Sequence, residues 1–135
     1  MGEKCKDKVR EAYKGRMSEV RTLWNLYKKD PEAYDDDAGT WTEYGLGFDY
    51  VPKGTFKGQR RGYFRYQISY GGPSEEFRFF VDEVLDITRA EFWYLDWFDG
   101  ASVRVTGRNL ETWREIWDDF QEMDLLRTKI GEAEE

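Results

Sequence analysis

Apolar positions recur every three or four residues near the start of the chain. Between about Glu3 and Lys29 they form one stripe, made of Val9, Tyr13, Met17, Val20, Trp24 and Tyr27. This spacing predicts an amphipathic helix. The helix is expected to stop at Asp30, because the residue before Pro31 is pushed out of helical geometry.

The same period returns near the end of the chain. Asn109 is the predicted N-cap of a second helix, whose apolar stripe consists of Leu110, Trp113, Trp117, Phe120 and Met123. The tail from Gly131 to Glu135 is expected to be frayed.

The middle of the chain alternates apolar and polar residues with a period of two, which is typical of strands. Apolar faces are predicted over 44–50, 64–70 and 77–81. Gly71 to Ser74 has the residue types of a turn, so residues 63–83 are interpreted as a hairpin. Asp99-Gly100 is a strong two-residue turn signal that leads into a last strand over 102–106.

Residues 91–100 read EFWYLDWFDG and differ from the other strands, because both faces of this segment carry aromatic side chains. Such a strand is either covered on both sides or offers one face to a partner. With two amphipathic helices available, it is interpreted as a central strand in which Phe92 to Leu95 are buried, while Trp97 and Phe98 lie nearest the hairpin tip.

These elements predict one α+β domain over residues 1–135. Its sheet is an antiparallel meander of four to five strands, and the N- and C-terminal helices pack on it. Whether the helices cover one face or both is left open by the sequence.

Composition excludes several kinds of chemistry. The chain has no histidine and only one cysteine, Cys5, so it cannot form a Ser-His-Asp or Cys-His triad, a histidine-containing zinc site or an internal disulfide. No apolar run approaches the roughly 20 residues of a membrane span. We therefore expect a soluble, cytoplasmic protein without enzymatic activity, cofactor or metal.

The net charge of −7 is unevenly distributed. Residues 1–29 hold nine Lys and Arg against four acids, whereas residues 30–135 hold twelve against twenty-four. A basic cluster lies in the loop from Lys53 to Arg65. An acidic cluster lies on the outer face of the second helix and consists of Glu111, Glu115, Asp118, Asp119 and Glu122. The cluster is either a solvated helix face or a surface for a basic partner.

Two other functions fit parts of the sequence. Trp93, Asp96 and Asp99 are residue types found in sugar-binding and glycoside-hydrolysing sites, although no spacing rule joins them. Lys57, Arg60 and Arg61 could contact phosphates, but a net acidic chain repels nucleic acid at long range. Direct nucleic-acid binding is therefore disfavoured, and a flexible basic loop is the simpler interpretation.

Three segments carry a resemblance: residues 44–50 (YGLGFDY), residues 62–67 with 71–77, and residues 92–100 (FWYLDWFDG). Together they resemble small uncharacterised proteins carried by bacterial plasmids, integrative elements and phages. The resemblance spans residues 44 to about 100 and brings no catalytic residues. It implies an anti-defence role, of the anti-CRISPR or antirestriction type.

The leading hypothesis is a non-enzymatic protein that occupies a basic or nucleic-acid-binding surface of a bacterial defence complex, in the host cytoplasm. The acidic cluster would supply the charge, and Trp97, Tyr63 and Arg65 are the expected anchors. A sugar-binding or hydrolytic domain built on Trp93, Asp96 and Asp99 is the alternative. A homodimer formed through the aromatic sheet is a further hypothesis.

Overall fold

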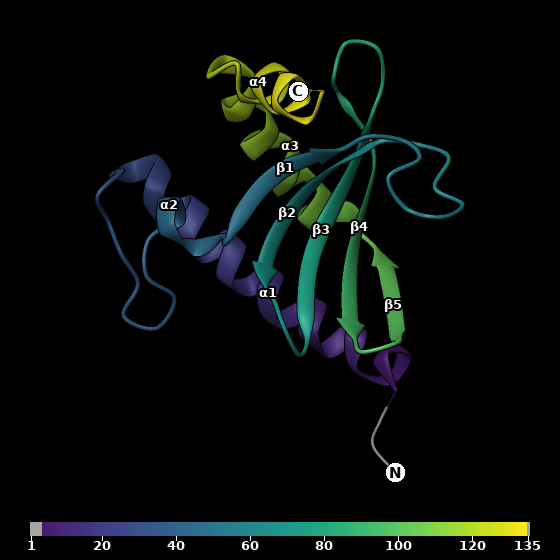
Figure 1. Cartoon of the computed structure of the whole chain (residues 1–135). Coiled ribbons are helices and arrows are strands. Elements are labelled where there is room, and N and C mark those ends of the chain that lie inside the picture. Colours follow the sequence, from purple (N-terminus) through teal and green to yellow (C-terminus); the bar gives the residue numbers. More distant parts are fainter. Residues whose placement is uncertain (1–3, 135) are drawn as a thin grey trace.

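The computed structural model describes residues 4–134, which form an antiparallel sheet backed by helices (Figure 1). The first helix, α1 (Cys5–Lys29), is followed by a single helical turn, α2 (Trp41–Tyr44). Five strands follow: β1 (Gly47–Val51), β2 (Tyr63–Ser69), β3 (Ser74–Val81), β4 (Ile87–Asp96) and β5 (Asp99–Arg104). The chain closes with α3 (Gly107–Glu122) and α4 (Leu125–Ala133).

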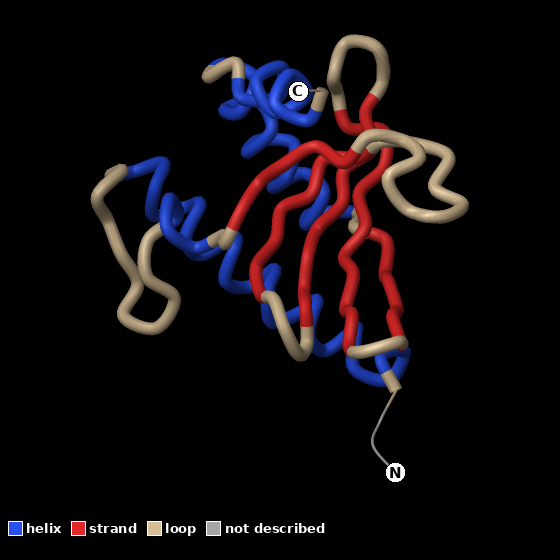
Figure 2. Tube along the Cα trace, viewed as in Figure 1, coloured by secondary structure: helices blue, strands red, loops and turns tan. Residues whose placement is uncertain are grey.

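The strands form a meander in the order β1-β2-β3-β4-β5, and every neighbouring pair is antiparallel. The α+β class, the single antiparallel sheet and the terminal helices predicted from the sequence are thus confirmed. Both long helices lie on the same side of the sheet, as Figure 2 shows, so the sheet has one helix-covered face and one open face.

The helix-covered face contains the main core. Register places Phe64, Phe79 and Ala90 in one row across β2, β3 and β4, and Tyr66, Phe77 and Phe92 in the next. All six side chains are buried. Because side chains alternate along a strand, one buried row fixes which residues lie on the open face.

The helices divide the covered face between them. α1 packs on β4 and β5, whereas α3 places Trp113 and Trp117 on β2 and β3. The Trp113 ring lies 4.9 Å from Phe77 and 4.8 Å from Phe79, measured between ring centroids. The Trp117 ring lies 4.9 Å from Phe79. Aromatic pairs at these separations contribute beyond the area they bury.

Several predicted boundaries are wrong. The first strand begins at Gly47 and not at Tyr44, because residues 41–44 form α2, whose Trp41 is buried against Trp24 and Tyr66. Glu3, where α1 was predicted to begin, lies outside the described residues. The two-faced segment is not one central strand: residues 91–96 belong to β4, the second strand from the edge of the sheet, which is covered by helices on one side, and the rest form the β4–β5 turn and the start of β5.

The last helical region also differs from the prediction. The N-cap of α3 is Thr106, and Asn109 lies inside the first turn. Its side-chain oxygen accepts a hydrogen bond from Arg21, and its amide donates one to the Tyr13 hydroxyl at 2.8 Å. The helix breaks at Asp124, and α4 includes Gly131 to Ala133, so this part of the tail is helical and not frayed. Glu135 lies outside the described residues.

The β4–β5 turn is formed by Trp97 and Phe98, not by Asp99-Gly100, because Asp96 pairs directly with Asp99. Asp99 instead accepts a hydrogen bond from the backbone N–H of Cys5 at 2.8 Å, at the start of α1. Trp97 has a φ of +55°, which is unfavourable for a bulky residue, and its side chain is 91% exposed. The turn therefore holds two exposed aromatic rings on a strained backbone.

Replacing Trp97 by Asn should stabilise the fold. Asn tolerates the left-handed conformation, and the exposed indole contributes little burial, so the free energy of unfolding should rise by about 0.5–1 kcal/mol in urea titrations. Phe98→Asn is the matched control: it removes an equally exposed ring at a residue without positive φ. That variant should stay within about 0.5 kcal/mol of the wild type. A loss of stability in Trp97→Asn larger than in the control would contradict this prediction.

Candidate functional site

The open face of the sheet carries a row of aromatic and charged side chains across β2, β3 and β4. At its centre lies Arg78, whose guanidinium carbon is 4.1 Å from the centre of the Trp93 ring and 4.9 Å from that of Tyr63. Phe80 extends the row, with its ring 5.7 Å from Tyr63. A guanidinium flanked by two rings at these distances is a favourable cation–π arrangement.

Two buried carboxylates belong to this row. Glu76 is only 3% exposed and accepts a hydrogen bond from Arg78 Nε at 2.7 Å. Glu91 pairs with Arg89 at 2.6 Å and accepts a hydrogen bond from Trp93 Nε1 at 3.1 Å. Burial of a carboxylate is unfavourable unless it is paired and hydrogen-bonded. These contacts therefore hold Arg78 and Trp93 in place.

The β1–β2 loop, residues 52–62, reaches from β1 to the β4 side of the sheet (Figure 1). Its shape is set by Gln59, whose amide nitrogen donates to the carbonyl oxygens of Pro52 at 3.1 Å and Arg61 at 2.8 Å. The amide oxygen of Gln59 accepts from the Phe56 N–H at 3.0 Å. The sequence suggested a flexible loop, but these hydrogen bonds give it a defined fold.

A cleft of about 570 Å³ lies between this loop and the open face, and we call it the loop cleft. Its size is in the range of small-molecule sites. The residues that line it are Phe56, Lys57, Gly58, Gln59, Arg60, Arg61, Tyr63, Arg78, Phe80, Glu91 and Trp93.

The rim and the floor of the loop cleft differ in electrostatics. Glu91, which lines the floor, and Glu76, the neighbour of Arg78, are each paired with an arginine. In the described part of the chain, Lys57, Arg60 and Arg61 form no ion pair, and Arg61 lies over the Phe80 ring at 5.3 Å. Burial raises the pKa of Tyr63, so this residue adds no negative charge to the cleft. The cleft therefore combines aromatic surface with uncompensated positive charge.

The predicted anchor residues lie in different places. Tyr63 and Arg65 are both on the open face, but Tyr63 is buried in the floor of the loop cleft. Arg65 is bound through two nitrogens to the Asp49 carboxylate, at 3.0 and 2.7 Å. Trp97 lies in the turn after β4 and does not line the loop cleft. These three residues therefore do not form one continuous surface.

The acidic cluster keeps its predicted position on the outer face of α3. Glu111, Glu115, Asp118 and Glu122 are exposed and lie opposite the buried stripe, whereas Asp119 is half-buried at the flank. Glu115 is not free: Lys28 of α1 binds it at 2.6 Å and Trp24 Nε1 donates to it at 3.3 Å. The hydrogen bond from Lys28 is the main cause that lowers the pKa of Glu115.

The residues of the sugar-site alternative are separated. Trp93 lies on the open face, whereas Asp96 is an odd number of residues away and lies on the helix-covered face. Asp99 is engaged by the backbone N–H groups of Cys5 and Gly100, and the hydrogen bond from Cys5 is the main cause that lowers its pKa. These three side chains therefore do not converge on one site.

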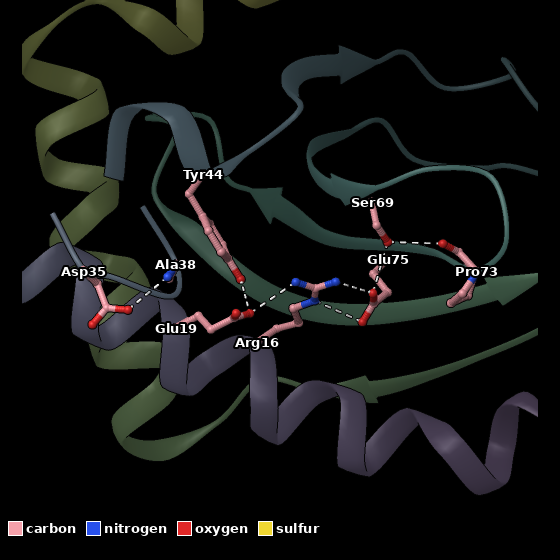
Figure 3. A network of polar contacts seen from close by, with 8 residues as sticks. All are labelled: Arg16, Glu19, Asp35, Ala38, Tyr44, Ser69, Pro73 and Glu75. Carbon is pink, nitrogen blue, oxygen red and sulfur yellow. Dashed lines mark hydrogen bonds and ion pairs between the residues drawn. The ribbon is translucent and has the colours of Figure 1, made fainter. Parts of the chain in front are cut away.

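A second polar cluster lies between α1, α2 and the sheet (Figure 3). Arg16 binds both oxygens of the buried Glu75, at 3.2 and 2.6 Å, and also donates to Glu19 at 3.1 Å. The Tyr44 hydroxyl donates to the same Glu19 oxygen at 2.8 Å, and Ser69 donates to Glu75 at 3.0 Å. Each carboxylate here already has partners within the chain. We interpret the cluster as a structural tie between α1 and the sheet.

Sequence reasoning missed three residues that line the loop cleft, Gln59, Arg78 and Phe80, and also Glu76, which pairs with Arg78. A signal was present in the alternation of β3, where Glu76, Arg78 and Phe80 share the face opposite Phe77 and Phe79. Two charged residues and one aromatic residue on the same face of a strand indicate a partly covered surface. The role of Gln59 had no signal, since it depends on the folded loop.

Breaking the buried ion pair between Glu76 and Arg78 should lower the stability of the fold. Arg78→Met leaves Glu76 buried without its partner, and the free energy of unfolding should fall by about 3 kcal/mol. In the double variant Glu76→Gln with Arg78→Met the unpaired charge is gone, so at least about 1 kcal/mol of that loss should be recovered. Urea denaturation of the single and double variants measures both values. Equal stability of Arg78→Met and the double variant would contradict a buried ion pair.

Among residues 4–134, no group of three or more Cys, Asp and Glu side chains is placed to hold a metal ion. Over the same residues, no helix has the length and apolar character needed to cross a membrane. In comparisons with protein-family models, with curated proteins and with solved structures, nothing matched this chain.

Proposed function

We propose that this protein is a non-enzymatic inhibitor, encoded by a mobile element or phage, of a bacterial defence complex that targets nucleic acid. In this proposal the outer face of α3 occupies a basic surface of that complex in place of nucleic-acid phosphates. The resemblance of residues 44–100 to proteins of plasmids, integrative elements and phages supports the biological setting.

The observation that carries the proposal is the geometry of the acidic face. Glu111, Glu115, Asp118 and Glu122 follow one another along a line of about 17 Å on a helix whose opposite side is fully packed. A rigid row of carboxylates can complement a groove that binds phosphates, and complementary charge accelerates association. Like charges at these spacings also weaken a helix slightly, so the fold itself gains nothing from the row.

Glu115 contributes in a different way from its neighbours. Its contacts with Lys28 and Trp24 fix α3 against α1, so the orientation of the row is set by packing.

The exposed Trp97 and Phe98 rings offer a second contact at the far end of the sheet. Aromatic residues are enriched among the side chains that dominate binding energy.

The proposal predicts that neutralising the row abolishes inhibition. The test variant is Glu111→Gln, Asp118→Asn and Glu122→Gln together, which leaves Glu115 and its contacts intact. Purified CRISPR effector complexes and restriction enzymes are assayed for DNA cleavage with increasing amounts of protein. Wild-type protein should inhibit at least one of them, and the triple variant should need at least roughly tenfold more protein, because several charge pairs with the partner are lost.

The matched control changes three exposed carboxylates in the loop after α1: Glu32→Gln, Asp36→Asn and Asp37→Asn. It alters net charge by the same amount and should inhibit like wild type. Both triple variants should keep the wild-type stability within about 0.5 kcal/mol. Full inhibition by the α3 variant, or an equal loss in both variants, would contradict the proposal.

A further inference from the structure

We propose that the loop cleft is a binding site for a nucleoside phosphate, a ligand that combines a planar base with an anionic group. The site is separate from the acidic face, because α3 packs on the covered side of the sheet and the loop cleft lies on the open side. Its test is therefore independent of the inhibitor proposal.

The aromatic part of the loop cleft suits a base. Trp93 lines it from the sheet, and Phe56, which is 52% exposed, lines it from the loop. Aromatic rings accept stacked bases, so Phe56 and Trp93 offer stacking surface from the loop and from the sheet. The guanidinium of Arg78, in contrast, is already flanked by Trp93 and Tyr63. An exposed phenyl ring on an ordered loop also has no role in the core.

The cationic part suits a phosphate. Lys57, Arg60 and Arg61 line the loop cleft and form no ion pair within the described residues. The nearby glutamates of the open face, Glu76 and Glu91, are already paired with Arg78 and Arg89. The local charge available to a ligand is therefore positive, although the whole chain carries −7. Arginine and lysine are the side chains that most often bind phosphate.

Size and overall charge favour a single nucleotide over a strand. A volume of about 570 Å³ fits one drug-sized ligand, and a strand would need a continuous positive groove beyond the cleft. The net negative charge of the chain repels a polyanion more strongly than a mononucleotide.

The hydrogen bonds of Gln59 support a prearranged site. They join the loop residues Phe56, Pro52 and Arg61 through one side chain. Two glycines, Gly54 and Gly58, have φ values of +79° and +76°, which complete the fold of the loop without steric cost. The loop then needs little further ordering when a ligand binds, and this lowers the entropic cost of binding.

The test is titration of the whole protein with ATP, GTP, CTP and UTP, and with their monophosphates, by calorimetry and by tryptophan fluorescence. At least one nucleotide should bind with a saturable isotherm and change the fluorescence. Inorganic phosphate, triphosphate and the free nucleosides should bind at least roughly tenfold more weakly, because each lacks half of the recognised chemistry. In Trp93→Phe the fluorescence change should be largely lost.

Two variants separate the two halves of the site. Lys57→Ala with Arg60→Ala should raise the Kd by roughly tenfold or more, whereas Arg10→Ala with Lys14→Ala, two exposed cations of α1, should leave it unchanged. Phe56→Ala should weaken nucleotide binding by roughly tenfold and leave triphosphate binding unaltered. All of these side chains are exposed, and thermal melting checks that each variant is folded.

Several results would overturn this proposal. These are the absence of saturable binding to every nucleotide, binding of triphosphate as tight as that of the nucleotides, and equal effects of the loop variant and the α1 variant. Tighter binding of a single-stranded oligonucleotide, with an affinity that falls steeply with salt, would replace the mononucleotide site with a strand-binding surface. Loss of inhibition in the α3 variant has no bearing on any of these outcomes.

Discussion

The packing of Trp113 and Trp117 on Phe77 and Phe79 joins the helical layer to the middle of the sheet. Because α3 occupies β2 and β3, α1 is left to cover β4 and β5, and both helices lie on one side. The other side of the sheet has no helical cover and must be stabilised by its own side chains and by the β1–β2 loop. The paired charges, the cation–π row and the loop cleft all follow from this one-sided arrangement.

The spacing of apolar residues along the sequence correctly predicts the α+β class, both long helices and the central hairpin, because each of these depends on local apolar spacing. It failed where a distant contact overrides local preference. Asp99-Gly100 is a good turn sequence, yet Asp99 binds the start of α1, and a Cβ on Gly100 would lie 2.8 Å from the Leu95 side chain. Two aromatic residues form the turn instead. Asn109 likewise has the residue type of an N-cap but serves as a bridge between α3 and two α1 residues.

The candidate sites were only partly visible in the sequence. The acidic row on α3 was foreseeable, since amphipathic spacing determines which side of a helix faces outward. The partners of Glu115 were not, because Lys28 and Trp24 come from the other end of the chain. The loop cleft depends on how residues 52–62 fold over β2 to β4, and no periodic pattern describes a loop. The sequence predicts Tyr63 as an anchor, whereas its side chain is buried in the floor of the loop cleft.

The contacts of α1 also bear on how the chain is synthesised. Met17 accepts a hydrogen bond from Trp113, Tyr13 from Asn109, and the N–H of Cys5 donates to Asp99. These three partners follow β4 along the chain, so α1 reaches its final packing only after β5 and α3 have been synthesised. During translation its apolar stripe has little of its final cover, while the strand hairpins can pair as they appear. Completion of this fold is consequently a late event in the life of the nascent chain.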